Sequence, residues 1–322
     1  MRKSVVICAY TEDRWDDIAM AIASCRAQSV PVDQLLLVID YNPSLAARAR
    51  AAFVDLEVLE NQYERGLSGA RNTGWRAASG EVVAFLDDDA VADQSWLEEL
   101  VAPFRDSRVA GVGGWVVPSW PAEPPRWFPE TFLWVLGCSY AGLPADGHEI
   151  RNPIGASMAF RSSVFDVAGG FSTELGRVGA NASGCEETEL CIRYARNVSN
   201  DRFVLSRTAI VHHRVPASRL TWQYMVRRCW SEGVSKAAVS TLAGAADGLS
   251  SERSYIARAI PLEIAASISA LPRDPRTEVR RLGRVVVGLF ATSIGFARGM
   301  IGIWIVRTRG TRAVGDPTTT SS

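Results

Sequence analysis

The segment that most constrains this chain is an apolar run that ends in three consecutive carboxylates, Glu81-Val-Val-Ala-Phe-Leu-Asp-Asp-Asp-Ala90. A short apolar run of this kind predicts a buried strand, with the carboxylates at its carboxyl end. Unpaired carboxylates beside a core are costly. A divalent cation that shares oxygen ligands with a phosphate group compensates their charge. The run therefore predicts a site for Mg²⁺ or Mn²⁺ with a diphosphate, and the alternative is a solvated acidic turn.

Residues 4–110 alternate apolar, strand-like runs with helical patterns. The expected strands are 5–9, 35–39, 54–59 and 81–86, and the expected helices are 15–27, 44–53, 66–78 and 95–104. This alternation indicates an α/β fold with a parallel sheet covered on both faces. Ligands of such sheets bind beyond the carboxyl ends of the strands. Tyr10, Asp40 and Asp87 each follow such an end, so we expect them on one rim.

Composition and the N-terminal run disfavour nucleic acid as a partner, a disulfide framework and secretion. Lysine plus arginine equals aspartate plus glutamate at 35 each, so no net positive field favours nucleic acid as a partner. The six cysteines form no CxxC pair, which indicates reduced thiols of a cytoplasmic protein. The apolar run after Met1 is too short for a signal-peptide core, so we expect a first strand and no secretion.

Two further segments carry weaker signals for a substrate pocket. The turn at Gly155, Ala156 and Ser157 would let the backbone approach a ligand closely. Residues 118–144 are rich in proline and tryptophan, which predicts a long loop without regular helix or central strand. Trp127 in this loop could offer an aromatic face to a sugar or a lipid, although a loop packed on its own aromatics fits the pattern equally well.

Adjacent glutamates mark another candidate. Glu186 and Glu187 begin an apparent amphipathic helix. Acids in a first turn are favoured by the helix dipole, which is the ordinary explanation. Facing a metal–diphosphate site, however, one of them could act as the general base for a sugar hydroxyl.

Four motifs occur in a fixed order: Val5–Tyr10, Gly66–Gly74, Phe85–Asp89 and Cys185–Leu190. Together they resemble family 2 of the inverting, nucleotide-sugar-dependent glycosyltransferases over roughly residues 4–215. Within that family the chain is similar to enzymes that extend lipid-linked saccharides, including glucuronosyltransferases acting on glucosyl-dolichyl phosphate. The resemblance implies a GT-A fold, a Rossmann-like mixed sheet flanked by helices. We expect this domain at 1–220, a helical membrane-associating region at 221–312 and a disordered tail at 313–322.

The resemblance also implies roles for particular residues. Those implied to bind the nucleotide are Ala9, Tyr10, Glu12, Asp40, Arg71, Asp87 and Asp88. Asp89 would ligate the metal. Glu187 stands where the family usually has the aspartate of a Glu-Asp pair, a departure that leaves open whether Glu186 or Glu187 is the base, and we favour Glu187.

A second metal ligand and the sugar pocket are suggested by the residues themselves. His212 and His213 follow an expected strand, and either imidazole could complete the metal shell, with His212 taken as the candidate. Gly155, Ala156, Ser157 and Trp127 make up the candidate pocket for donor and acceptor sugars.

The reaction expected from these roles is a single in-line displacement with inversion at the anomeric carbon. The resemblance favours a UDP-sugar donor, although no residue separates UDP from GDP, and the acceptor would be a glycan or polyprenyl-linked saccharide. A glucuronate donor would need a cation near its carboxylate, and spacing does not choose among Arg161, Arg177 and Arg193.

Two other functions compete with this one. An inactive GT-A scaffold predicts damaged site positions, yet Asp87, Asp89 and Glu187 are all carboxylates. A sugar nucleotidyltransferase predicts a glycine-rich basic loop after the first strand, where this chain has the acidic Ala9–Asp13.

The C-terminal region raises the question of a membrane. Residues 282–306 are almost all apolar, interrupted only by Arg284 and Arg298, and approach the ~20 residues that span a bilayer. On a helix, the arginines and glycines share one side and bulky apolar residues take the other. Such a helix can lie in the membrane interface or dock its glycines on another helix. We expect a peripheral or monotopic helix on the cytoplasmic side of the membrane, with a companion at 255–271 interrupted at Pro261.

Overall fold

The computed structural model describes residues 1–173, 184–243 and 250–313. The strands are β1 (Lys3–Ala9), β2 (Gln34–Ile39), β3 (Glu57–Glu60), β4 (Val82–Asp87), β5 (Ala90–Ala92), β6 (Val109–Ser119), β7 (Glu149–Ile150), β8 (Ser157–Arg161) and β9 (Arg202–Arg214). The helices of the sheet domain are α1 (Trp15–Arg26), α2 (Pro43–Ala52), α3 (Leu67–Ala77), α4 (Trp96–Val101), α5 (Ser162–Ala168) and α6 (Glu186–Asn197). Short 3₁₀ helices are η1 (Glu12–Arg14), η2 (Ala102–Arg105), η3 (Glu130–Leu136) and η4 (Ala217–Leu220). The tail expected at 313–322 lies, from residue 314 on, outside the described residues.

The strands form one mixed sheet in the order β3-β2-β1-β4-β8-β6-β9-β5, with β7 paired to β9. β3, β2, β1 and β4 are parallel to one another, as the alternation of strands and helices predicts. The second half is different, because β8 runs antiparallel to β4 and β5 runs antiparallel to β9. The sheet is therefore the mixed sheet that the family resemblance implied.

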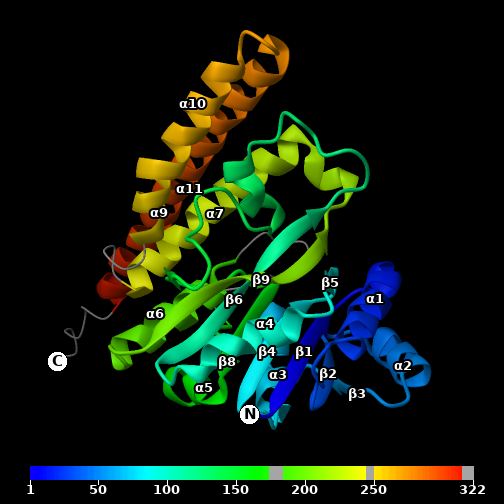
Figure 1. The fold of residues 1–322 in the computed structure, drawn as a ribbon. Helices are drawn as coiled ribbons and strands as arrows, with labels where there is room; N and C mark the ends of the chain where they lie inside the picture. Colours follow the sequence, from blue (N-terminus) through cyan, green and yellow to red (C-terminus); the bar gives the residue numbers. More distant parts are fainter. Residues whose placement is uncertain (174–183, 244–249, 314–322) are drawn as a thin grey trace, which may run out of the picture.

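Helices cover both faces of this sheet (Figure 1). Successive strand residues point to opposite faces, so Val5 belongs to the apolar cluster that contains Ile18 of α1 and Leu97 of α4. Its neighbour Val6 belongs to the cluster on the other face, with Ala70 of α3. Because helices cover both faces of the sheet, we look for a ligand site at the ends of its strands.

The proline-rich loop after β6 packs on its own aromatic residues. Phe128 and Phe132 are buried in it, and Trp127 contacts Phe128 with ring centroids 5.7 Å apart. Its one helical element is the 3₁₀ helix η3, so the expectation of a long loop without regular α-helix holds.

A bundle of helices follows the sheet and projects away from it (Figure 1). It consists of α7 (Trp222–Ala243), α9 (Ser250–Ser254), the π-helix η5 (Tyr255–Ala259), α10 (Ile260–Ala270) and α11 (Pro275–Ala313). Two glycines let α7 and α11 touch backbone to backbone. A Cβ on Gly233 would lie 2.1 Å from the Thr292 carbonyl oxygen, and one on Gly295 would lie 2.2 Å from that of Trp230.

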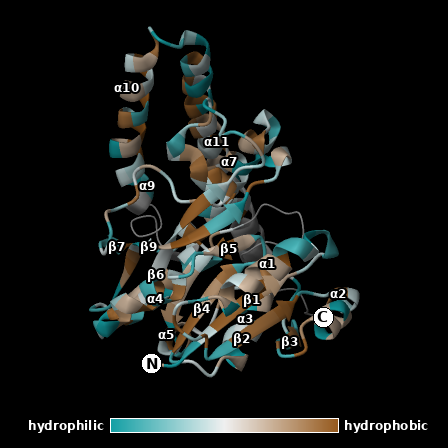
Figure 2. Cartoon of the chain, turned by 45° about the vertical axis from the view of Figure 1, so that its right-hand side comes forward, coloured by the Kyte–Doolittle hydropathy of each residue, from teal (hydrophilic) through white to brown (hydrophobic). Residues whose placement is uncertain are grey.

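The opposite side of α11 keeps bulky apolar residues in the open. Figure 2 shows apolar residues along the helices that project from the sheet, and Phe290 and Val286 are 65% and 63% exposed. Among the described residues, Pro275–Trp304 is the one helical stretch long and apolar enough to cross a membrane by length and composition. The glycines thus dock on another helix, as one of the two sequence alternatives expects, while the bulky apolar face is uncovered.

Candidate active site

Asp87 and Asp89 meet His213 at the carboxyl end of β4. β5 begins directly after Asp89 and pairs antiparallel with β9, which sets Ala90 opposite His213. One ligand atom from each of Asp87, Asp89 and His213 lies within 4.8 Å of the others. Carboxylate oxygens and an imidazole nitrogen are ligands that Mn²⁺ accepts, and the carboxylates suit Mg²⁺ as well. These residues fit a divalent cation.

Cationic side chains of the protein surround the same carboxylates. Arg14 donates to Asp88 at 2.7 Å and lies 3.1 Å from Asp89, and the His213 Nε2 lies 3.1 Å from the other oxygen of Asp89. Arg219 of η4 is 3.7 Å from Asp89. Burial alone would raise the pKa of Asp89, but His213, Arg14 and Arg219 hold it well below its usual range. Asp88 is buried beside the Asp89 charge, and its pKa rises to about 7.

The structure corrects the choice of histidine. His212 points to the opposite face of β9, where its Nε2 lies 2.9 Å from Asp93, and it is exposed. His213 is buried beside Asp89. Because side chains alternate along a strand, only one of two adjacent histidines can reach the carboxylates.

Arg71 of α3 links the aspartates to the glutamate pair. This guanidinium is 2% exposed, and it lies 3.3 Å from Asp87 and 2.7 Å from Glu186. It also donates to the carbonyl oxygen of Gly155 at 3.0 Å. Arg71 was expected on the nucleotide side of the cleft. It stands between the two groups of carboxylates and neutralises Glu186.

Glu187 has a different environment from Glu186. Burial, and next the charge of Glu186, raise the pKa of Glu187 to about 8, while Arg71 opposes this rise. The preceding residue, Cys185, adopts a left-handed conformation with φ of 76°. Such a backbone is costly for a residue other than glycine and is common at functional sites. Here it precedes the first turn of α6, which places the Glu187 carboxyl group in the wall of a cavity.

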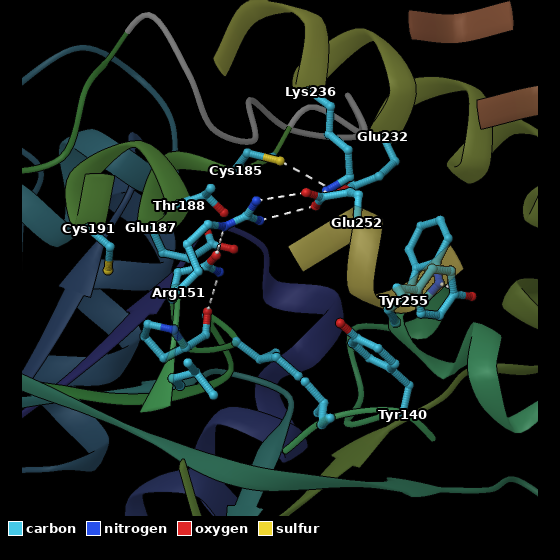
Figure 3. Close-up of a pocket in the computed structure, with 18 of the residues that line it drawn as sticks. Tyr140, Arg151, Cys185, Glu187, Thr188, Cys191, Glu232, Lys236, Glu252 and Tyr255 are labelled. Atoms are coloured by element: carbon cyan, nitrogen blue, oxygen red, sulfur yellow. Dashed lines mark hydrogen bonds and ion pairs between the residues drawn. The ribbon is translucent and has the colours of Figure 1, made fainter. Parts of the chain in front are cut away.

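A cavity of about 910 Å³ extends from Asp87 to the helical bundle. Figure 3 shows the part of it that lies between Glu187 and Glu252. Its wall contains six of the expected site residues: Arg71, Asp87, Gly155, Ala156, Glu186 and Glu187. His213 also lines it. Side chains separated by up to 142 residues in the chain thus share one cavity.

Two expected pocket residues lie elsewhere. Ser157 is fully buried, and its hydroxyl accepts a hydrogen bond from Trp96 at 2.9 Å, because the strand β8 turns this side chain into the core. Trp127 stacks under Arg284 of α11, with the guanidinium carbon 3.7 Å from the ring centroid. The aromatic residues that do line the cavity are Phe132, Trp134, Tyr140, Phe203 and Tyr255.

Four of the residues expected to hold the nucleotide, Ala9, Tyr10, Glu12 and Asp40, lie at or near neighbouring strand ends and outside this wall. The backbone amide of Asp40 donates to the Ala9 carbonyl oxygen at 2.8 Å, so the ends of β1 and β2 are adjacent. The Asp40 carboxylate accepts from the Gly66 amide at 3.0 Å. Tyr10 is exposed at the end of β1, and Glu12 lies in η1, 3.8 Å from Arg48.

Sequence reasoning missed several charged residues around the site. Arg14 and Arg219 contact the aspartates, and five charged residues line the far part of the cavity: Arg151, Arg228, Glu232, Lys236 and Glu252. Isolated charged residues belong to no motif, so only the pairing of distant elements reveals them. Of the arginines weighed for a uronate, Arg161 donates to the carbonyls of Val109 and Phe104 and Arg193 pairs with Glu189, whereas Arg177 lies outside the described residues.

Comparison with known proteins identifies the family of this chain. Residues 4–169 match the family model of glycosyl transferase family 2. The chain is 31% identical over 306 residues, 94% of this chain and 97% of the relative, to the glucosyl-dolichyl phosphate glucuronosyltransferase of Haloferax volcanii. It is also 27% identical, over 70% of this chain and 71% of the relative, to the succinoglycan biosynthesis protein ExoM of Rhizobium meliloti.

A solved structure shares the fold. The mannosyltransferase PcManGT of Pyrobaculum calidifontis, solved with GDP-mannose and Mn²⁺, superposes with a TM-score of 0.55 at 18% identity, covering 90% of this chain and 86% of that one. This likeness supports the GT-A fold. The chain belongs to glycosyl transferase family 2 and is a glycosyltransferase.

Proposed function

We propose that this glycosyltransferase moves a sugar from a nucleoside-diphosphate donor, UDP-linked by preference, to a hydroxyl of a lipid-linked saccharide, with inversion. The observation that carries the proposal is the single cavity shared by Asp87, His213 and Glu187. A donor bound at the aspartates can present its anomeric carbon to an acceptor hydroxyl beside Glu187.

The aspartates and His213 would hold Mg²⁺ or Mn²⁺. The bound cation supplies neutralising charge for the diphosphate leaving group. Ala9, Tyr10, Glu12 and Asp40, at or just beyond neighbouring strand ends, would hold the nucleoside, and Asp88 would fix Arg14 beside it. Arg71 keeps Asp87 and the Glu186 carboxylate in a fixed relation across the cavity.

Glu187 would act as the general base. Glu186 is engaged by Arg71 at 2.7 Å, whereas the pKa of Glu187, raised to about 8 by burial and by Glu186, suits a group that takes and releases a proton near neutral pH. In-line attack by the deprotonated hydroxyl, opposite the leaving diphosphate, inverts the anomeric centre. Gly155 and Ala156 would leave room for the sugar.

The lipid-linked acceptor is proposed from the Haloferax relative, whose name specifies glucosyl-dolichyl phosphate as substrate. The cavity wall continues to Leu289 and Thr292 of α11, the helix with the uncovered apolar face. We place the catalytic domain at 1–220 and a helical region at 221–312 that holds it, peripherally or monotopically, on the cytoplasmic side of the membrane.

A transfer assay tests this function. The full chain is incubated with Mn²⁺, a glucosyl prenyl phosphate and, in turn, UDP-glucuronate, UDP-glucose and GDP-mannose. We expect one α-linked UDP donor to yield a β-linked product by mass spectrometry and NMR, EDTA to stop the reaction and Mn²⁺ to restore it. A product that keeps the donor's configuration, or release of pyrophosphate from a sugar phosphate and UTP, contradicts the proposal.

A further inference from the structure

A group of charged residues lines the cavity beyond Glu187. Arg228, Glu232 and Lys236 come from α7, Arg151 comes from the loop before β8, and Glu252 comes from α9. We call these five residues the charged wall. Figure 3 shows Arg151, Lys236 and Glu252 joined by ion pairs, in the same cavity as Glu187.

The geometry at Glu252 is that of a bound oxyanion. One carboxylate oxygen accepts from Arg151 at 2.8 Å, and the other accepts from Arg151 at 3.1 Å and from Lys236 at 2.5 Å. A planar guanidinium fork that grips two oxygens is the arrangement with which arginine recognises carboxylates and phosphates. The carboxylate of Glu252 thus has the chemistry of a ligand carboxylate or phosphate.

The position of the charged wall points to substrate rather than to stability alone. Arg281 and Glu263 form another largely buried pair, 2.7 Å apart, but neither borders the cavity. The wall, in contrast, faces the space that contains the candidate base. Glu252 also comes shortly before the π-helix η5, and such helical irregularities are frequent at functional sites.

We propose that Arg151 and Lys236 form an oxyanion subsite for a sugar substrate, and that Glu252 fills this subsite until a substrate carboxylate or phosphate replaces it. This inference rests on the proposed function. The oxyanion can come from two sources, a uronate carboxylate on the donor sugar or the phosphate of the lipid-linked acceptor. Both would extend from a sugar held near Glu187 toward the wall.

The test uses Arg151→Gln and matched substrates that differ by one oxyanion. The donors are UDP-glucuronate and UDP-glucose, and the acceptors are a glucosyl prenyl phosphate and an alkyl glucoside. In one of these two pairs, we expect the kcat/KM of Arg151→Gln for the substrate that carries the oxyanion to fall about ten- to a hundredfold. This is the range for a lost charge-assisted hydrogen bond. The pair that discriminates identifies the source. Arg281→Gln, which breaks a pair outside the cavity, is the control and is expected to treat both members alike.

Glu252→Gln provides a second, opposite test. It removes the competing charge, so the KM of the same substrate should fall about two- to tenfold, because apparent affinity scales with the fraction of molecules whose site is open. A structural role predicts no gain for any substrate. This variant keeps the proposal testable if Arg151→Gln does not fold, which thermal melting would reveal.

Calorimetric binding of the same four ligands, with Mn²⁺ present, separates failure of this proposal from failure of the proposed function. Equal losses for charged and uncharged ligands in Arg151→Gln, or no gain in Glu252→Gln, overturn the oxyanion subsite. Absence of transfer by the natural protein, with charge-selective binding intact, contradicts the proposed function and leaves the subsite supported.

Discussion

At the level of single residues, the direction of a side chain decides which of two adjacent histidines can reach the aspartates. His212 and His213 are chemically equal in the sequence, but His213 is in phase with the buried Val211 and His212 with the exposed Arg214. A strict reading of strand alternation would have selected His213. The wrong choice of His212 shows that the alternation of side chains along a strand predicts which of two adjacent residues faces the core, even where the motif is weak.

This difference predicts distinct effects of two neighbouring substitutions. His213→Ala should weaken binding of Mn²⁺ in the presence of UDP by at least about tenfold, since even groups that only orient ligands contribute that much. His212→Ala should leave binding unchanged, because its imidazole faces Asp93 on the other side of β9. Titration calorimetry measures both. Loss of binding in His212→Ala with normal binding in His213→Ala would reverse the assignment.

Motif residues could be predicted, and their neighbours could not. The carboxylates Asp87, Asp89 and Glu187 stand in recognisable sequence contexts. Arg151 and Glu252 are 101 residues apart and meet only because α9 folds back over the loop before β8. Arg71 was expected near the nucleotide, but its position depends on α3 and α6 flanking the same strand end, which no local pattern records.

At the scale of elements, prediction succeeded where local periodicity suffices. The strands and helices of residues 4–104 fall within a few residues of their expected bounds, with β3 shorter than expected at Glu57–Glu60. Periodicity alone did not predict the second half of the sheet, for which only the family resemblance implied mixed pairing, because β6, β8 and β9 pair across long sequence separations. Pairing of this kind depends on tertiary contacts rather than on propensity.

The helices after the sheet illustrate a subtler limit. An interruption was expected at Pro261, because proline lacks the N–H that an α-helix needs. In the structure, the π-helix η5 directly precedes α10, and α10 begins with Pro261 in its first turn. The π-helix thus lies about one turn before Pro261, the residue that explains it. Tyr255 of this π-helix lines the cavity.

At the scale of the whole molecule, the helical bundle extends the cavity from the sheet to Leu289 and Thr292 of α11, a helix with exposed apolar residues. Arg284 of α11 stacks on Trp127 and lies 5.2 Å from the ring of Trp222, which ties this helix to the proline-rich loop and to α7.

The uncovered face of α11 therefore predicts membrane binding. The double variant Val286→Glu, Phe290→Glu should reduce co-sedimentation with phospholipid vesicles at least about tenfold, because burial of each large apolar side chain contributes roughly 1.5–3 kcal/mol. Val54→Glu is the control, since Val54 is 85% exposed before β3, far along the chain from α11. Anchoring through this face is ruled out if the natural chain does not co-sediment with the vesicles. It is also ruled out if the double variant co-sediments as well as the natural chain.

The most direct measurement of the central claim compares Glu187→Gln with Glu186→Gln in turnover and donor binding across pH. The account predicts that Glu187→Gln binds the donor normally and that its kcat is lower by a factor of about 10²–10⁴. The rate of the natural enzyme should rise with pH through an apparent pKa of about 8, and this rise should be absent in Glu187→Gln. The rate falls below that pH because the base must be ionised. Full turnover in Glu187→Gln, with Glu186→Gln inactive yet folded, would contradict it.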